Sequence, residues 1–273
     1  GVIDVDLHEC MMLKAIQTTI AKDKENNDMS LYDWYAKALS DNKQILQRIT
    51  NVLVADSAFS KKPFIDNMLG IGFNVVSRLR HDAALYYLWE GDPTGKPGRP
   101  RVKGEKIDFK NIDKSKVAIL DTDESNGQVY ALKAWCKSLH RKISLVIHIL
   151  PKGGHRLYFS TDESMSGRDV MEYYCTRFQI EFCFRDAKQF VGLTDSQARD
   201  TRKLDFAFNS SFTAVNVAKI MCSEYNLSIW RLKALIINAY YAQRIIDVFE
   251  NNPNTQLNHE IVNEIFGFAA DAA

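Results

Sequence analysis

The stretch that most constrains this chain is residues 173–188, which reads YYCTRFQIEFCFRDAK. At about 100° per residue, a helix here gathers polar side chains within an arc of roughly 80° on one face. These side chains are Tyr174, Arg177, Glu181, Arg185 and Lys188. The opposite face carries Ile180, Cys183, Ala187 and Phe190, as expected of a helix that lies on a core. The carboxylate could bind a hard cation and the cations could bind phosphate, or the face could be solvated, with spaced ion pairs.

The exact spacing favours the first interpretation. Tyr174-x2-Arg177-x3-Glu181-x6-Lys188 resembles the Y-x2-R-x3-E-x6-K signature of DDE transposases of the insertion sequence 4 family. The flanking segments YFSTDES (158–164) and KQFVGLTDSQAR (188–199) are also similar to that family. The resemblance runs through nearly the whole chain. It implies an α/β fold: a ribonuclease-H-like mixed sheet with flanking helices, interrupted by a β-rich insertion domain and followed by a helical C-terminus.

Charge and cysteine content agree with a cytoplasmic protein that binds DNA through a local surface. The net charge of the 273 residues is only +1, but residues 99–152 hold 12 Lys/Arg against 6 Asp/Glu, and such a patch could follow a phosphate backbone. Five scattered cysteines without C-x-x-C pairs favour reduced thiols over a disulfide frame or a zinc site. No run approaches the roughly 18 apolar residues of a membrane span, so no membrane partner is expected.

The order of expected elements divides the chain into four parts. Residues 1–82 form the first part of the core. Strands are expected at 1–6, 9–19, 51–59 and 73–80. One helix is capped by Ser30 and continues through Ile49, and a second helix at 62–69 has Pro63 in its first turn. Residues 83–154 form the insertion, with a loop at 91–104, a hairpin turn at 123–127, and strands beginning at Lys106, Lys116, Gln128 and Lys142. Residues 155–225 return to the core, with Ser164 or Ser166 capping the helix of residues 174–188. Residues 226–273 form C-terminal helices, expected at 228–250 and 258–268.

Aligned with the family, this order lacks the first strand of the core, which carries the first catalytic Asp. The second catalytic Asp is then Asp56, at the end of the strand NVLVADSAF, and we expect the first to lie upstream of Gly1. In that case these 273 residues would be catalytically silent alone. The competing interpretation takes Asp4 or Asp6, on the opening strand, as the first metal ligand.

The resemblance also implies the roles of individual residues. Asp56 and Glu181 would be catalytic and would bind two Mg²⁺ or Mn²⁺ ions about 4 Å apart. Tyr174, Arg177 and Lys188 would bind DNA, and Arg185 is a looser assignment of the same kind. Asp66, Asp162 and Asp186 are expected in turns, in caps or at the surface. Trp34 and Trp230 are expected in the core. Trp89 and Trp135 are expected to pack against the protein rather than to stack on DNA bases.

The implied function is metal-dependent cleavage and strand transfer of an insertion sequence. The partners are double-stranded DNA, as transposon ends and as target, and a second copy of the chain, because two ends are cut together. Two alternatives remain open at this point: a metal-dependent nuclease without strand transfer, and a truncated relic that at most binds DNA.

Overall fold

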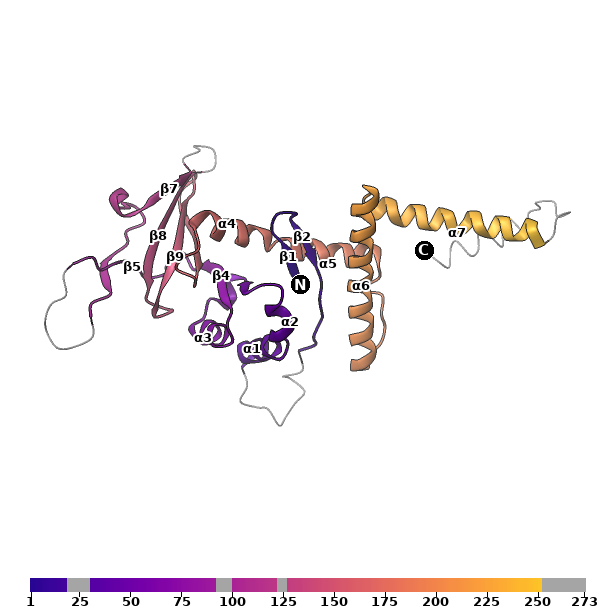
Figure 1. Ribbon diagram of the computed structural model, residues 1–273, viewed down its shortest axis with the longest axis horizontal. Helices are drawn as coiled ribbons and strands as arrows, with labels where there is room; N and C mark the ends of the chain where they lie inside the picture. Colours follow the sequence, from indigo (N-terminus) through magenta and orange to yellow (C-terminus); the bar gives the residue numbers. More distant parts are fainter. Residues whose placement is uncertain (19–29, 92–99, 122–126, 252–273) are drawn as a thin grey trace. The chain divides into compact units, whose positions relative to one another are not determined.

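The computed structural model describes residues 1–18, 30–91, 100–121 and 127–251 (Figure 1). The chain forms two compact units, which are described separately. The larger unit comprises residues 3–10 and 16–181, and the smaller comprises residues 1–2, 11–15 and 182–273.

The larger unit is built on a mixed sheet of eight strands. Seven of them follow the order β3-β4-β10-β9-β8-β5-β6, and β7 pairs with β8 beside this path. The strands are β3 (Val52–Val54), β4 (Asn74–Leu79), β5 (Leu85–Leu88), β6 (Lys103–Lys106), β7 (Ala118–Asp121), β8 (Gln128–Cys136), β9 (Arg141–Ile149) and β10 (His155–Ser160). β3 and β4 are parallel, and the other pairs are antiparallel. The predicted α/β class is confirmed, and the mixed sheet with helices is consistent with a ribonuclease-H-like fold.

Each face of this sheet has its own apolar cluster. On one face, α3 (Lys62–Gly70) buries Phe64, Ile65 and Met68 against alternate strand residues such as Ile143 and Leu145. On the other face, α4 (Gly167–Thr176) packs across β4, β10, β9 and β8, with Val170 against Val76, Val146 and Tyr158. Because successive strand residues point to opposite faces, β9 is apolar on both sides, as a central strand must be.

The predicted helix starts are confirmed where capping residues marked them. Ser30 caps α1 (Leu31–Asp41) in a capping box with Asp33, and Pro63 lies in the first turn of α3. Of the two candidates for the later helix, Ser166 is the cap, because its hydroxyl accepts the Asp169 N–H at 3.2 Å. The helix expected to run on through Ile49 instead breaks at Asn42, and α2 (Lys43–Gln47) follows.

Several predicted strands are shorter than expected. β1 (Val2–Asp4) and β2 (Glu9–Met11) form a two-stranded sheet, and the strand predicted for 9–19 ends at Met11. The reason is that two Asn side chains of α6 (Thr201–Tyr225) take the place of a neighbouring strand. The Asn216 amide accepts the Met12 N–H at 2.9 Å and donates to the Met12 C=O at 2.8 Å. The Asn209 amide accepts the Ala15 N–H at 2.9 Å and donates to the Ala15 C=O at 3.1 Å.

In the predicted insertion, β6 ends where the strand from Lys106 was expected to begin, and the other three strands are confirmed as β7, β8 and β9. These strands belong to the same sheet as β3, β4 and β10. The predicted turn at 123–127 falls largely on residues outside the described ranges, and the predicted helix 258–268 falls there entirely.

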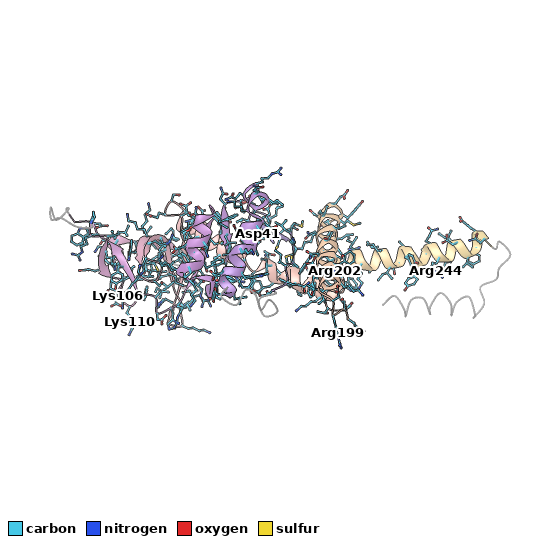
Figure 2. All side chains as sticks on the ribbon, turned by 90° about the horizontal axis from the view of Figure 1, so that it is seen from below. Asp41, Lys106, Lys110, Arg199, Arg202 and Arg244 are labelled. Atoms are coloured by element: carbon cyan, nitrogen blue, oxygen red, sulfur yellow. The ribbon has the colours of Figure 1, made fainter. Side chains whose placement is uncertain are left out.

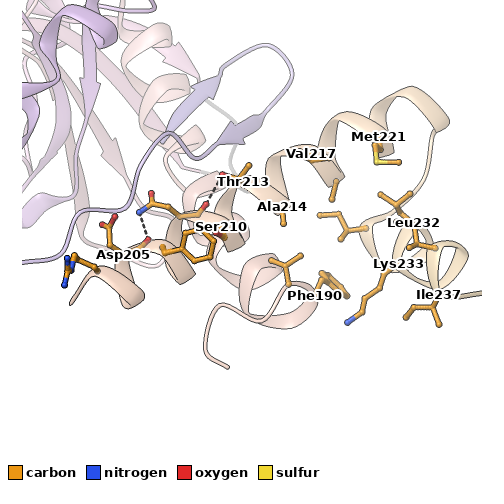
Figure 3. A pocket seen from close by; sticks show the side chains of 17 residues that line it. Phe190, Asp205, Ser210, Thr213, Ala214, Val217, Met221, Leu232, Lys233 and Ile237 are labelled. Carbon is orange, nitrogen blue, oxygen red and sulfur yellow. Dashed lines mark hydrogen bonds between the residues drawn. The ribbon is translucent and has the colours of Figure 1, made fainter. Parts of the chain in front are cut away.

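The smaller unit contains the two longest helices described. α6 ends at Tyr225, its C-cap Asn226 takes a left-handed conformation (φ 52°), and α7 (Ile229–Asn251) follows. The two helices line a groove of about 910 Å³ with mainly apolar side chains, among them Val217, Met221 and Leu232 (Figure 3). The core position predicted for Trp230 is wrong, because 67% of this residue is exposed, while Trp34 is half-buried. Within the residues described, no helix is both long and apolar enough to cross a membrane.

Candidate active site

Asp56 lies where β3 ends, on an exposed turn. Its carboxylate accepts the Ser57 N–H at 2.7 Å and caps the short 3-10 helix Ser57–Phe59, which is why the predicted strand 51–59 stops early. Its backbone carbonyl accepts a hydrogen bond from the buried Ser77 hydroxyl of β4 at 3.1 Å. The backbone is therefore fixed to the sheet, while the carboxylate keeps an oxygen directed to solvent.

The predicted helix of residues 174–188 is two helices, and the break lies at the motif Arg. α4 ends at Thr176, Arg177 is its C-cap, and α5 (Gln179–Phe190) begins two residues later. The backbone bonds around the break run from residue i to i−3, with Arg177 N–H to Tyr174 O at 3.2 Å and Glu181 N–H to Phe178 O at 3.0 Å. A single helical arc for all five motif side chains is therefore wrong.

Across this break, Arg177 reaches Glu181. The guanidinium Nη2 donates to Glu181 Oε1 at 3.0 Å, and the side chains are 26% and 47% exposed, respectively. The pair fixes the orientation of the carboxylate and leaves its second oxygen available. The Nε of Arg177 is buried, and no group in the described part of the chain accepts a hydrogen bond from it. Because this nitrogen is enclosed by the protein, Arg177 acts at the site through its bond to Glu181 and through the charge of its guanidinium.

Tyr174 connects Asp56 to this pair. Burial raises the pKa of its phenol above the ordinary 10.0, Arg177 and Arg78 oppose that shift, and Asp56 adds to it. Tyr174 also packs on Tyr158 with ring centroids 5.0 Å apart, and Arg177 lies over its ring at 5.9 Å. A phenol is protonated at physiological pH even at its ordinary pKa, so Tyr174 can donate a hydrogen bond to a phosphate oxygen.

The remaining motif residues lie further along α5, in the part of the helix that belongs to the smaller unit. Lys188 is exposed in the last turn. Arg185 is 60% exposed, bonds Asp186 at 3.0 Å and lies over Phe182 at 4.7 Å. Asp186 is 7% exposed, so the expected turn, cap or surface position of this residue is wrong. The predicted apolar face is confirmed for Cys183 and Ala187, which are fully buried.

Other candidate acids have local structural roles. Asp162 accepts the Ser164 N–H and hydroxyl in a turn, and these bonds lower its pKa. Asp66 pairs with Lys62 and Arg141 on the face of the sheet that α3 covers. Asp4 accepts the Leu7 N–H in the turn after β1. Five free cysteines agree with the predicted reduced thiols.

Two residues near Tyr174 were not predicted from the sequence. Arg78, on β4, and Tyr158, on β10, are direct neighbours in the sheet, and both influence the Tyr174 phenol. The signal was available for Tyr158, because it opens the flanking segment YFSTDES. Arg78 follows Asp56 by 22 positions, and only the pairing of β3 with β4 brings the two segments together.

The donors at this site fit a hard divalent cation. Asp56 and Glu181 each keep a carboxylate oxygen, and Mg²⁺ is commonly held by one or two carboxylates together with substrate phosphate. Among the described residues, no group of three or more His, Cys, Asp or Glu side chains could hold a metal ion. The α6–α7 groove contains a single carboxylate, Asp205, and is too apolar for this purpose.

A comparison with protein families identifies the family to which most of the chain belongs. The family model described as a transposase DDE domain matches residues 35–217, well over half of the chain and including Asp56 and the whole motif from Tyr174 to Lys188. No curated protein matches the chain. At the level of the family, this domain implies DNA cleavage and strand transfer in transposition, generally with divalent metal ions. The chain belongs to the family of proteins with a transposase DDE domain.

Proposed function

We propose that this chain is the catalytic part of a transposase of the insertion sequence 4 type, which cuts the ends of its element and joins them to target DNA. One observation carries the proposal: Asp56, Tyr174, Arg177 and Glu181 belong to one compact unit, with Tyr174 within electrostatic reach of Asp56 and Arg177 bonded to Glu181. The family match supports the reaction class, and the motif spacing supports the subfamily.

In this mechanism the carboxylate side chains and the basic side chains have separate tasks. Asp56 and Glu181 would hold two Mg²⁺ or Mn²⁺ ions, which when bound would activate the attacking oxygen and stabilise the leaving one. Arg177 orients Glu181 through Oε1, and its guanidinium charge would attract the phosphate of the element end. Tyr174 donates a hydrogen bond from its phenolic O–H to the same phosphate, and Lys188 and Arg185 bind the DNA beside the scissile bond.

The reaction begins when water attacks the phosphodiester at the element end and releases a 3′-hydroxyl. That hydroxyl would attack the opposite strand to form a hairpin and release the flanking DNA, and a second water would reopen the hairpin to regenerate the 3′-hydroxyl. In the last displacement the 3′-hydroxyl attacks a phosphodiester of the target, forms the new strand junction and releases a target 3′-hydroxyl. Because two ends must be joined to one target, we propose that the protein acts as a homodimer on double-stranded DNA.

Strand transfer separates this function from that of a nuclease with the same core. We expect the complete protein, given labelled element-end DNA, a target plasmid and Mn²⁺, to produce labelled plasmid as well as nicked ends. Nicked ends without labelled plasmid would favour the nuclease. Binding without any nicking would favour the inactive relic.

A further inference from the structure

A group of lysines and aromatic side chains lies on one face of the sheet, away from the candidate active site. In the register of the strands, Lys106 of β6 is opposite Tyr86 of β5, Tyr86 is opposite Trp135 of β8, and Trp135 is opposite Lys142 of β9. Directly opposite residues share a face, so these four side chains form one row across four strands. Neighbouring strands lie about 4.8 Å apart, so the two lysines are roughly 14 Å apart at their backbones.

Two further lysines extend the row. Lys103, opposite Leu88, places its ammonium 5.7 Å from the centroid of the Tyr86 ring and 5.9 Å from that of Trp135. Lys133 lies two residues before Trp135 on β8 and therefore on the same face. All four lysines are exposed, whereas Tyr86 and Trp135 are half-buried beneath them. We call Lys103, Lys106, Lys133 and Lys142 the lysine row.

The acidic residue nearest to these lysines in the sequence is Glu105, which is exposed on β6 between Lys103 and Lys106 and forms an ion pair with neither. Within the described residues, none of the four lysines forms an ion pair, although Lys62, Lys116, Arg141 and other cations of the same unit do. Outside the row, Arg101 lies over the ring of Trp89 at 3.9 Å. Lys106 lies at the surface at this end of the unit (Figure 2).

The lysine row and α4 occupy the same face of the sheet. Gly167, at the start of α4, lies against Ala131 and Val146. Ala131 shares a strand face with Lys133 on β8, and Val146 shares one with Lys142 on β9, because these pairs are two and four residues apart. At the other end, α4 carries Tyr174 over Tyr158 and reaches Arg177. Both regions belong to the larger unit, so their relative positions are fixed by one sheet.

We propose that the lysine row is a second DNA-binding site, which holds the phosphate backbone of the duplex that flanks the cleavage site. Exposed lysines that form no ion pair among the described residues attract a polyanion, and binding releases counterions from the DNA. The 14 Å between Lys106 and Lys142 is comparable to the width of the major groove, about 12 Å, so both lysines can contact phosphates on its two sides. The half-buried aromatic rings keep Lys103 extended by cation–π contacts. The inference rests on the proposed function, because it assigns the same DNA to this surface.

The salt dependence of duplex binding tests this proposal without any need for catalysis. Binding of a fluorescent duplex of about 30 base pairs is measured by anisotropy between about 50 and 200 mM salt, with metal removed. The logarithm of the binding constant falls linearly with the logarithm of the salt concentration, and each lost phosphate contact makes this slope shallower by about 0.9. The triple substitution Lys106→Ala/Lys133→Ala/Lys142→Ala should therefore make it shallower by about 2 to 3. The matched control is Lys110→Ala/Lys114→Ala/Lys137→Ala, which removes the same charge from exposed lysines outside the row. This control should change the slope by less than about 1.

A slope for the row variant equal to that of the control would overturn the proposal, provided that both variants melt at the temperature of the unchanged chain. The outcome is separable from the proposed function. If the unchanged protein shows the lysine-dependent slope but yields no strand-transfer product, the proposed function fails and the DNA-binding surface stands. If strand transfer occurs while the row variant binds like the control, only the surface is wrong.

Discussion

Glu181→Gln is expected to lower metal-dependent cleavage by the complete protein about a hundredfold or more, while duplex affinity stays within about threefold. The amide keeps the shape of the side chain and its Oε1 acceptor, so the 3.0 Å bond from Arg177 can persist. The negative charge that would hold the cation is lost. The change should therefore act on the chemical step and leave the fold and the phosphate contacts of Arg177 intact.

The control for this variant is Glu172→Gln. Glu172 is also exposed and lies nearby on α4, but it takes no part in the ion pair between Arg177 and Glu181. Its cleavage rate should match that of the unchanged protein. Cleavage by the Glu181 variant within about tenfold of the unchanged rate would show that Glu181 is not a metal ligand.

Gly167→Ala is expected to reduce the free energy of unfolding by about 1 to 3 kcal/mol and to impair cleavage. A Cβ at this position would lie 2.5 Å from the Ala131 Cβ, 2.8 Å from Leu120 and 3.3 Å from Val146. None of these atoms is the end of a long flexible side chain, so α4 or the strands beneath it must move. The movement would displace Tyr174 and Arg177, which depend on α4 for their position.

Gly70→Ala is the matched control, because nothing lies within 4 Å of a Cβ at that helical position. Alanine is favoured over glycine in a helix by roughly 0.5 to 1 kcal/mol, so this variant should be as stable as the unchanged chain or more stable. Denaturant unfolding of both variants measures the difference. Equal stability of the two variants would mean that α4 does not depend on this close approach.

Local signals in the sequence were enough to predict the parts of the fold that short-range chemistry determines. Ser30, Pro63 and Ser166 mark helix starts because their side chains or rings satisfy the geometry of a first turn. The apolar runs of β4, β8 and β9 identify strands of a buried sheet. The motif spacing identified Glu181 and Arg177, which are bonded to each other.

Features that depend on distant residues were not predictable in the same way. The segment after Met11 has a strand-like sequence, but its backbone partners are Asn209 and Asn216, which are 194 and 204 positions away from Ala15 and Met12, respectively. The break at Arg177 carries no Gly or Pro, so the helical period ran through it without interruption. Arg78 enters the site only through strand pairing, and Trp230 is exposed on α7 despite its apolar character.

The central claim, that Asp56 and Glu181 hold the catalytic metal, can be tested directly by iron-mediated cleavage of the polypeptide. Fe²⁺ replaces Mg²⁺ in the complete protein bound to DNA, and ascorbate with peroxide then generates hydroxyl radicals that cut the backbone nearest the metal. We predict cuts beside residues 56 and 181, which are lost together in Asp56→Asn. Cuts beside Asp4 or Asp6 in place of residue 56, or cuts that persist in Asp56→Asn, would contradict the assignment.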